Sequence, residues 1–547
     1  MATSILSIGQ SALAAAQVGL STAGHNIANA STPGYNRQVV VQGAAMSQNF
    51  GFGFLGQGTE ISTVKRIYNE YLGVQVQSAQ TSKSGLDSYY AQIRKIDNML
   101  ADPASGLSPA LQDFFSGIQE VASNPASIPA RQAALSSAES LASRFHSLAG
   151  RLNEIAQGVN SQVLESVSAI NTYAQQIAGL NDAIGRAQRA SGQPPNDLLD
   201  MRDQLVLDLN KEIKTTVVKQ SDGDYNVFIG NGQPLVVGVK TSTLANMASP
   251  TNPEKIEVAY RASDGSLVAV GESGFVGGKL GGLIEFRGKT LEPAQNALGR
   301  VAIGLASTFN AQHKLGFDLN GDPGVDAFSL PTPVVTASGN NDASSTAAVS
   351  ASISNVNALT ASDYRLDYDG SAYTLTRLSD KTATTFAGLP ATTLEGFDLA
   401  LSGTPVAGDS FLIRPTVNGA SGLGVAIADP RLIAAATTTG AVGDNGNALK
   451  LGALQTANTL NGGTATYQGA YSQFVSQIGN KTRELEVTSN AAGKLLNEAT
   501  LTLQNESGVN LDEEAANLLR YQQAYQAAAK VMQIASEMFD MLLTLGR

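Results

Sequence analysis

The side chains that could carry out chemistry are few in this sequence, and they are not grouped. The chain of 547 residues has no Cys, no Trp and three histidines. Without Cys, neither a disulfide framework nor a thiolate metal site can form. His25, His146 and His313 stand alone, without the H-E-x-x-H spacing of a zinc site, and no G-x-S-x-G motif is present. We therefore expect no catalytic residue, no cofactor and no metal ion.

Two glycine-rich segments match phosphate-binding motifs only in part. Residues 51–56 match G-x-G-x-x-G, but the dinucleotide fingerprint also needs a strand before it and a helix after it. Residues 59–64, which follow, have the pattern of a strand. Gly278-Lys279 resembles the end of a P-loop, yet the leading glycine and the final Ser or Thr are missing. We expect the glycines of the first segment to form turns, and the second segment fails the P-loop pattern.

An aspartate-rich segment has the spacing of a calcium loop at its first three ligand positions. Asp318, Asn320 and Asp322 are two residues apart. The glycine of such a loop is replaced by Pro323, and its final glutamate by Ser329. The favoured interpretation is a turn held by Asx side chains.

Charge and hydropathy exclude several other classes of protein. The net charge is −11, and charged residues make up 15% of the chain against roughly a quarter in typical domains. Binding to nucleic acid is not expected, because neutralising phosphates requires clustered Lys and Arg. No segment reaches the roughly 18 apolar residues of a membrane span. The absence of Lys and Arg before Arg37 makes a poor secretory signal, so composition fits a cytosolic protein or one exported without cleavage.

A seven-residue apolar repeat runs through the first thirty residues. It consists of Leu6, Leu13, Leu20 and Ile27, with Ala16 and Ala23 at the intervening positions. This repeat predicts a helix with a coiled-coil-like seam, in which small Ala residues permit close approach of a partner helix. Pro33-Gly34 then ends the helical pattern.

The far end of the chain has a matching repeat. Its apolar positions are Leu511, Leu518, Tyr521, Tyr525, Ala528, Met532, Ala535, Phe539 and Leu542. Only Glu514 interrupts this frame, and Asn510 with Glu513 forms a predicted capping box. Both ends could be core helices of one globular domain, or they could pair with each other and then with neighbouring molecules. The single charge within residues 1–50 favours the second alternative, because an isolated pair would expose apolar surface.

The middle of the chain predicts an α+β multidomain fold. Helical stripes at residues 86–100, 107–121, 131–190 and 475–499 predict an elongated bundle built from both ends of the chain. Strand patterns separated by turn dipeptides predict β structure between them. The predicted domains are an axial helical domain (1–80 with 507–547), a bundle (81–325 with 451–506) containing a small β subdomain at about 213–282, and an inserted outer all-β domain (326–450).

The segment that ends the first helix resembles a motif of the flagellar axial proteins, which include the rod, hook and hook-associated proteins. The matching residues are Asn29, Thr32, Pro33, Gly34 and Tyr35. Four further stretches, at residues 196–205, 277–287, 315–322 and 508–525, are similar to the hook-associated protein 1 family. The resemblance covers roughly 1–325 and 470–547, and the β insert carries little of it.

This resemblance implies a structural adaptor rather than an enzyme. Its copies would form a ring at the distal end of the hook and join the hook to the filament, outside the cell and after type III export without a cleaved signal peptide. The implied partners are other copies of the chain, the hook protein, hook-associated protein 3, and an export chaperone that binds the C-terminal helix. The predicted assembly interface comprises Leu6, Leu13, Leu20, Ile27, Leu511, Leu518, Tyr521, Tyr525, Met532, Phe539 and Leu542.

Three other functions compete with the adaptor. The chain could be another rod or hook subunit. The β insert could be an adhesin-like binding module. A hydrolase anchored by the terminal helices is a further alternative, but the missing site motifs count against it.

Overall fold

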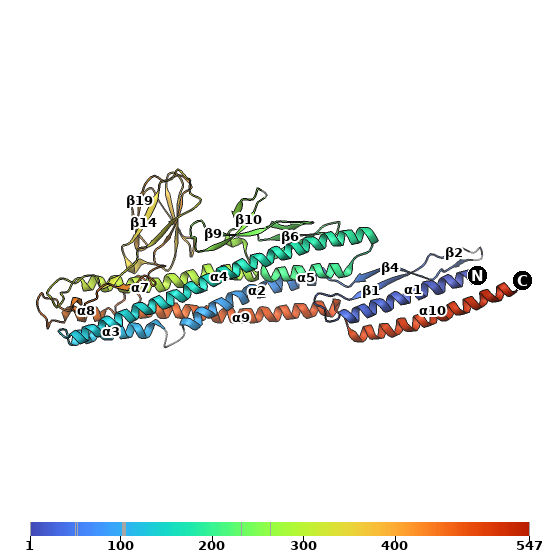
Figure 1. The fold of residues 1–547 in the computed structure, drawn as a ribbon, viewed down its shortest axis with the longest axis horizontal. Helices are drawn as coiled ribbons and strands as arrows, with labels where there is room; N and C mark the ends of the chain where they lie inside the picture. The colour runs from blue at the N-terminus through green and yellow to red at the C-terminus, as the bar shows by residue number, and fades with distance from the viewer. Residues whose placement is uncertain are drawn as a thin grey trace.

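The chain forms a long, narrow molecule in a computed structural model, with both termini at the same end (Figure 1). The structure describes residues 2–49, 51, 53–100, 106–230, 232–262 and 264–545, apart from the side chains of residues 2–4, 391–393, 542 and 545. Within these ranges, no helix combines the length and the apolar character needed to span a membrane.

The terminal region consists of two antiparallel helices and a β ribbon. Its elements are α1 (Ala2–Asn29), α10 (Leu511–Leu545), β1 (Gln38–Ala44), β2 (Gln48–Asn49), β3 (Phe54–Leu55) and β4 (Thr59–Arg66). The ribbon pairs β1 with β4 and, at its tip, β2 with β3. The predicted cap of α10 is present, since Asn510 Oδ1 accepts from the backbone N–H of Asp512 at 3.0 Å and of Glu513 at 3.3 Å. The Glu513 carboxylate pairs with Arg37 instead of completing the capping box.

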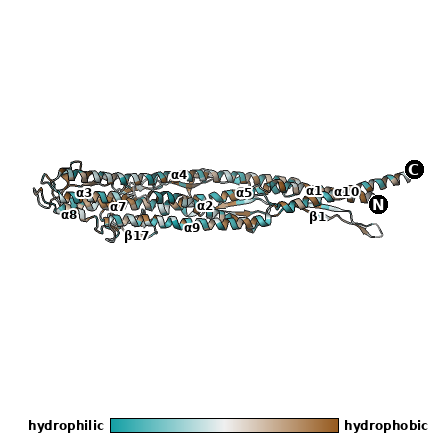
Figure 2. Cartoon of the chain, turned by 90° about the horizontal axis from the view of Figure 1, so that it is seen from below, coloured by the Kyte–Doolittle hydropathy of each residue, from teal (hydrophilic) through white to brown (hydrophobic). Residues whose placement is uncertain are grey.

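In the part of the chain that the structure describes, eight α-helices build the central bundle. They are α2 (Glu70–Leu100), α3 (Leu107–Ser123), α4 (Ile128–Ser191), α5 (Asn196–Glu212), α6 (Gly278–Phe286), α7 (Glu292–His313), α8 (Gly446–Ala453) and α9 (Tyr467–Ser507). Figure 2 shows the long helices lying along the molecular axis, with the terminal pair continuing beyond them. The longest helix, α4, begins at the capping residue Ser127, whose hydroxyl accepts from Ala130 N, and ends at Gly192 in the left-handed conformation. The bundle thus confirms the predicted elongated helical core.

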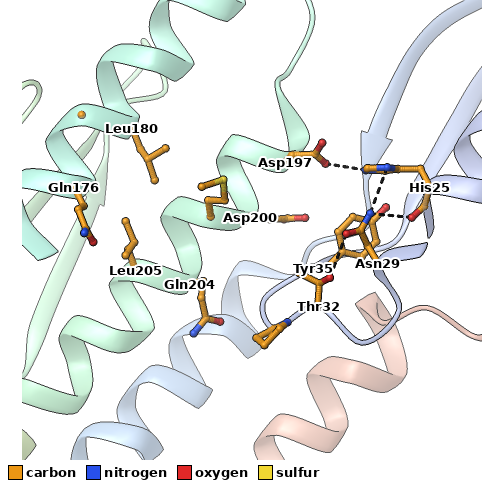
Figure 3. A pocket seen from close by; sticks show the side chains of 13 residues that line it. His25, Asn29, Thr32, Tyr35, Gln176, Leu180, Asp197, Asp200, Gln204 and Leu205 are labelled. Atoms are coloured by element: carbon orange, nitrogen blue, oxygen red, sulfur yellow. Dashed lines mark hydrogen bonds and ion pairs between the residues drawn. The ribbon is translucent and has the colours of Figure 1, made fainter. Parts of the chain in front are cut away.

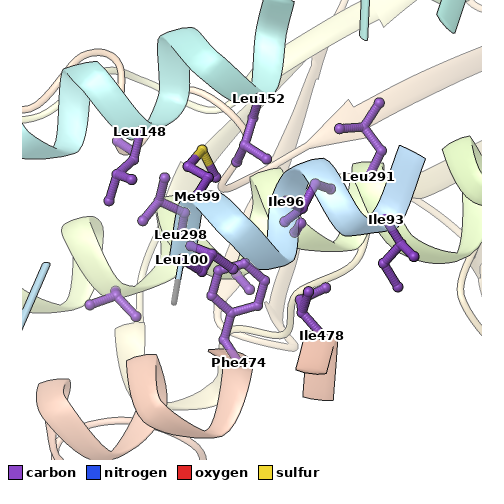
Figure 4. Packing of buried hydrophobic residues seen from close by; sticks show 14 of the residues in the cluster. Ile93, Ile96, Met99, Leu100, Leu148, Leu152, Leu291, Leu298, Phe474 and Ile478 are labelled. Carbon is purple, nitrogen blue, oxygen red and sulfur yellow. The ribbon is translucent and has the colours of Figure 1, made fainter. Parts of the chain in front are cut away.

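The core of the bundle is formed by the predicted helical stripes (Figure 4). Ile93 and Ile96 of α2, with Phe474 of α9, are at most 5% exposed and meet side chains from α4 and α7. Each fully buried Leu, Ile or Phe contributes about 1.5–3 kcal/mol. The two halves of the sequence therefore depend on one another for their stability.

The small β subdomain lies between α5 and α6 in the chain. Its strands are β5 (Thr215–Lys219), β6 (Tyr225–Ile229), β7 (Gln233–Val237), β8 (Lys240–Thr241), β9 (Leu244–Ala248), β10 (Ile256–Arg261) and β11 (Leu267–Ala269). They form a four-stranded sheet, β5-β6-β7-β8, and a three-stranded sheet, β11-β10-β9. The predicted hairpins are present, but their loops are longer than two residues, because Lys219 pairs with Tyr225 and Ile229 pairs with Gln233.

The outer insert projects from the side of the bundle (Figure 1). Its strands are β13 (Val334–Ala337), β14 (Ala348–Ile353), β15 (Tyr364–Tyr368), β16 (Tyr373–Arg377), β17 (Ala383–Phe386), β18 (Ala391–Leu394), β19 (Phe397–Ser402) and β20 (Ser410–Arg414). The strands form a five-stranded sheet, β13-β20-β15-β16-β17, and a three-stranded sheet, β14-β19-β18. Buried residues of both sheets form a hydrophobic core that is distinct from the core of the bundle. The α+β multidomain fold is therefore confirmed.

The insert is narrower than predicted. Strands β12 (Phe328–Ser329) and β21 (Gly424–Val425) pair where the chain leaves and returns. Leu423, Ile427 and Ile433 then join the core of the bundle rather than that of the insert. The sequence assigned this returning segment to the insert because its Ala, Thr and Gly content resembles that of the strands. The other domain limits stay predictions.

Candidate functional site at the terminal helices and their joint with the bundle

Helices α1 and α10 pair through small residues. Gly9, Ala16, Gly19 and Ala23 are buried on α1, and Ala528 and Ala535 are buried on α10. A Cβ atom added to Gly9 would lie 2.9 Å from Met532 Sδ, and one added to Gly19 would lie 2.5 Å from Tyr521 Cδ1. Both distances are below van der Waals contact, so the helices approach closely only because these side chains are absent.

The closest contact lies at the small residues of the predicted repeats, which are Ala16 and Ala23 on α1 and Ala528 and Ala535 on α10. On α1, Leu13, Leu20 and Ile27 flank the contact and are half-buried, and Leu6 is 37% exposed. On α10, the half-buried residues are Leu518, Tyr521 and Met532, and the exposed ones are Leu511, Tyr525 and Phe539. The side chain of Leu542 lies outside the described part. The predicted repeat omits Gly9 and Gly19, because glycine does not count as apolar, although it permits the closest helix contact.

A second apolar stripe on α10 was missed by the sequence reasoning. Val531, Ile534, Met538 and Met541 follow heptad spacing and are between 39% and 64% exposed. Ile534, Met538 and Met541 lie on a different side of α10 from Ala528 and Ala535, which face α1. Val531 borders the contact, since its Cγ1 lies 3.5 Å from the position of a Cβ on Gly9. In the sequence, these four residues form a second apolar repeat, which is offset from the repeat that begins at Leu511. The ribbon tip adds Met46 and Phe54, which are 92% and 74% exposed.

The axial motif closes the end of α1 against strand β1. Asn26 is fully buried, and its side chain donates to Gln38 O at 2.8 Å and accepts from Gln38 N at 3.0 Å. Tyr35 Oη donates to Asn26 Oδ1 at 2.7 Å. Burial, followed by the nearby carboxylates of Asp197 and Asp200, raises the pKa of Tyr35. Asn26 therefore joins the end of α1 to strand β1 and to the turn that follows α1.

The other motif residues shape the turn after α1. Thr32 Oγ1 donates to Asn29 Oδ1 at 3.2 Å, and Asn29 Nδ2 donates to His25 O at 3.1 Å. Gly34 has φ +77°, and a Cβ there would meet the side chain of Gln204 at 2.7 Å. The motif thus requires glycine both for conformation and for contact with α5. Pro33 lines the pocket described below.

A buried polar cluster joins this terminal region to the bundle. Asp200 of α5 accepts from Asn36 N at 3.0 Å, from Asn36 Nδ2 at 2.6 Å and from Arg66 Nη1 at 2.6 Å. Arg66 also pairs with Asp203 at 2.7 Å, and Tyr225 Oη donates to Asp203 Oδ1 at 2.8 Å. We call these five residues the joint cluster.

Burial governs the electrostatics of the joint cluster. It raises the pKa of Asp200, although hydrogen bonds from Asn36 and Arg66 act in the opposite direction. Burial alone would lower the pKa of Arg66, but Asp203 and Asp200 outweigh it and the pKa is raised. The guanidinium of Arg66 is therefore held as a cation between two carboxyl groups.

A pocket of about 700 Å³ opens beside the joint cluster (Figure 3). One wall is apolar, with Leu180 of α4 and Leu205 of α5. The other wall is polar, where His25 Nε2 lies 3.2 Å from Asp197 Oδ1. No group of three or more His, Asp or Glu side chains suited to a metal ion occurs among the described residues.

The remaining glycine-rich signatures have structural roles. A Cβ on Gly282 would lie 2.2 Å from Gly85 O, so the 277–287 signature is the close contact of α6 with α2. Gly51 and Gly53 have positive φ and lie in the turn between β2 and β3, as expected for turn glycines. Phe52, within the G-x-G-x-x-G match, lies outside the described residues.

The calcium-like segment is an Asx turn at the opposite end of the bundle. Asp318 Oδ1 accepts from the backbone N–H of Asn320 at 2.8 Å and of Asp322 at 2.9 Å. His313 nearby is fully buried, with Nδ1 2.6 Å from Val325 O and Nε2 accepting from Ala434 N at 2.9 Å. This is a packing histidine, as expected, and burial lowers its pKa.

Protein-family models match both ends of the chain. A model described as flagella basal body rod protein matches residues 6–36, and one described as the C-terminal part of the flagellar basal body rod FlgEFG proteins matches residues 504–545. These segments are α1 with its following turn, and α10 with the end of α9. The paired terminal helices therefore define a flagellar axial protein.

The middle of the chain and its relatives give the particular family. Models described as the flagellar hook-associated protein FlgK helical domain and the hook-associated protein 1 D2-like domain match residues 93–328 and 337–415. Flagellar hook-associated protein 1 of Escherichia coli (strain K12) is 37% identical, and that of Salmonella typhimurium is 38% identical. Each alignment covers 99% of this chain and 100% of the relative. The solved structure of the hook junction protein FlgK from Burkholderia pseudomallei is 31% identical, with a TM-score of 0.74, over 79% of this chain and 99% of that one. The chain belongs to the flagellar hook-associated protein 1 family.

Proposed function

We propose that this chain is the adaptor that joins the flagellar hook to the filament, and that it assembles through its paired terminal helices. The observation that supports assembly is the second stripe on α10, of which α1 borders only Val531. Exposed apolar stripes of this kind mark protein interfaces. Membership in a family of structural flagellar proteins supports association as the function of this chain.

The energy available from this stripe explains why assembly needs a lattice. Val531, Ile534, Met538 and Met541 are each roughly half exposed, so each would gain about 1 kcal/mol from complete burial. The sum, about 4 kcal/mol, only reaches the lower estimate of the cost of association, about 4–15 kcal/mol. Two free copies should therefore associate weakly. A subunit entering a tube meets several neighbours at once and gains more.

The proposed partners are those that the family resemblance implies. The terminal pair would contact other copies and the hook protein, and hook-associated protein 3 would continue the tube toward the filament. An export chaperone would cover the exposed face of α10 before export through the flagellar channel without signal cleavage. The adaptor would then act outside the cell, at the hook–filament junction. The adhesin-like alternative for the β insert stays a prediction.

Electron microscopy of cells lacking the gene, with a flagellin immunoblot of the medium, tests the adaptor function. Hooks without filaments and flagellin released to the medium are expected. Intact filaments would refute the proposal, and loss of the hooks would move the protein to the rod or the hook.

A matched pair of variants tests the α10 stripe. Ile534→Asp should prevent incorporation, because it places a charge on the stripe. Gln526→Asp, on the polar side of the same helix, should incorporate normally. Thermal unfolding of both purified chains checks that the bundle is intact. Equal incorporation of the two variants would exclude the stripe from assembly.

A further inference from the structure

The joint cluster draws together segments that are far apart in the sequence. Asn36 follows α1, Arg66 ends β4, Asp200 and Asp203 lie on α5, and Tyr225 begins β6. Asn36 and Asp200 are 164 residues apart. The cluster therefore connects three bodies: the terminal region, the bundle and the small β subdomain.

The contacts of the cluster restrict the orientation of the terminal region as well as its distance from the bundle. The side chains of Arg66, Asp200 and Asp203 are 11%, 6% and 12% exposed, so water screens their charges poorly. Both oxygens of Asp200 accept from Asn36, one from its backbone and one from its side chain. A buried ion pair of this kind adds little net stability, but removing one partner leaves an unpaired charge.

A second set of contacts lies beside the cluster. Gln38 Nε2 donates to Asp197 Oδ1 at 2.7 Å, and Asn196 Nδ2 donates to Val64 O at 2.8 Å. On the side of α9, Arg37 N donates to Ser507 O at 2.8 Å. The terminal region is thus held from two sides, which a free hinge would not be.

Arg202 extends the connection into the β subdomain. It is 1% exposed, and its guanidinium carbon lies 3.5 Å from the centre of the Tyr225 ring. Its Nη1 donates to Asn181 Oδ1 and to Gly223 O, both at 2.9 Å. The tyrosine that bonds Asp203 is therefore itself held in place by α4, α5 and its own hairpin.

We propose that Asp200 and Asp203 are positioning residues, which fix the direction of the terminal pair relative to the bundle. This inference rests on the proposed function, because an adaptor between two tubes must present its axial helices at one set angle. The stretch at residues 196–205, which contains both aspartates, would then determine the angle between the terminal pair and the bundle. The pocket beside it is a consequence of the same junction.

Substitutions on α5 test this role in the purified full-length chain. In Asp200→Asn, hydrogen exchange of residues 36–66 should rise at least tenfold, while exchange in α3 and α4 stays unchanged. Small-angle scattering should show a broader distribution of lengths. Asp200→Glu keeps the carboxylate and should restore most of the protection. Asp182→Asn, which removes a partly exposed partner of Arg186 on α4, is the matched control and should behave as the parent chain.

Each outcome decides the proposal. Unchanged exchange and scattering in Asp200→Asn would overturn it. Collapse of protection in the bundle would also overturn it, because the residue would then be needed for folding rather than direction. Arg66→Gln removes the same contact from the side of the terminal region. It should give faster hydrogen exchange of residues 36–66 and leave exchange in the bundle unchanged. These readouts need no flagellum, so they remain decisive even if cells lacking the gene keep their filaments. In cells, Asp200→Asn should give detached or kinked filaments at the junction.

Discussion

Gly19 offers the sharpest test of how α1 and α10 pair. A methyl group at this position would lie 2.5 Å from Cδ1 and 2.8 Å from Cγ of Tyr521. Carbon atoms normally approach to about 3.5–4.0 Å, so the ring or the helix must retreat by about 1 Å. Overpacking of this kind costs about 1–3 kcal/mol, whereas replacing Gly by Ala in a helix gains about 1 kcal/mol. Gly19→Ala should therefore weaken the pairing by up to about 2 kcal/mol, which is up to about thirtyfold in the equilibrium constant.

Gly24 provides the matched control within the same helix. Apart from its chain neighbours and the backbone of its own helix, no atom of the described residues lies within 4 Å of the Cβ that alanine would add there. Gly24→Ala should therefore stabilise α1 by about 0.5–1 kcal/mol through helix propensity alone. The two variants make the same chemical change and are predicted to have opposite signs.

Hydrogen exchange of the α1 amides in the full-length chain measures both effects. Exchange should be faster in Gly19→Ala and slower in Gly24→Ala than in the parent chain, with the α4 amides as an internal reference. If Gly19→Ala slows exchange as Gly24→Ala does, then α1 does not pack on α10 at this distance in solution. The small-residue seam would then be refuted.

Three further predictions concern other parts of the chain. Phe539→Asp should abolish incorporation into flagella and leave the middle domains folded, and electron microscopy showing normal filaments would contradict this. Burial lowers the pKa of His313 below its ordinary value of 6.5, so its contribution to stability should be complete above that pH and lost as the pH falls below it. The pH dependence of thermal unfolding should be weaker in His313→Gln, and an identical pH dependence would refute the role of this histidine. Gly282→Ala should destabilise the bundle by more than about 1 kcal/mol, because its Cβ would meet the backbone of α2, and an unchanged denaturant midpoint would exclude that contact.

The long helices were predictable because each carries enough periodic apolar residues to define its buried face. The stripe from Leu141 to Ile184 predicted most of α4, and the capping residue Asn510 predicted the start of α10. The hairpin of β15 and β16 is one of the strand patterns separated by a turn dipeptide, here Asp369-Gly370, that predicted β structure in the middle of the chain. In all three cases the signal is local, since propensity and capping act within a few residues.

The faces of the terminal helices were less predictable. The sequence showed a seven-residue repeat in each helix, and this determined that they are amphipathic. Several stripes on α1 share that period, and the leucine stripe was the obvious one. The repeat included Ala16 and Ala23 of the buried contact and missed Gly9 and Gly19, because the gain from close helix approach depends on the partner surface.

By itself, the sequence determined the α+β class, the succession of helices and strands, and the motifs that carry the family resemblance. Only the tertiary structure decided that two of those motifs meet, with Asn36 and Arg66 on one side and Asp200 and Asp203 on the other. The reason is physical: a buried ion pair between segments more than 130 residues apart leaves no periodic or local trace. Each charged residue looks like a surface residue until the fold removes water from around its partner.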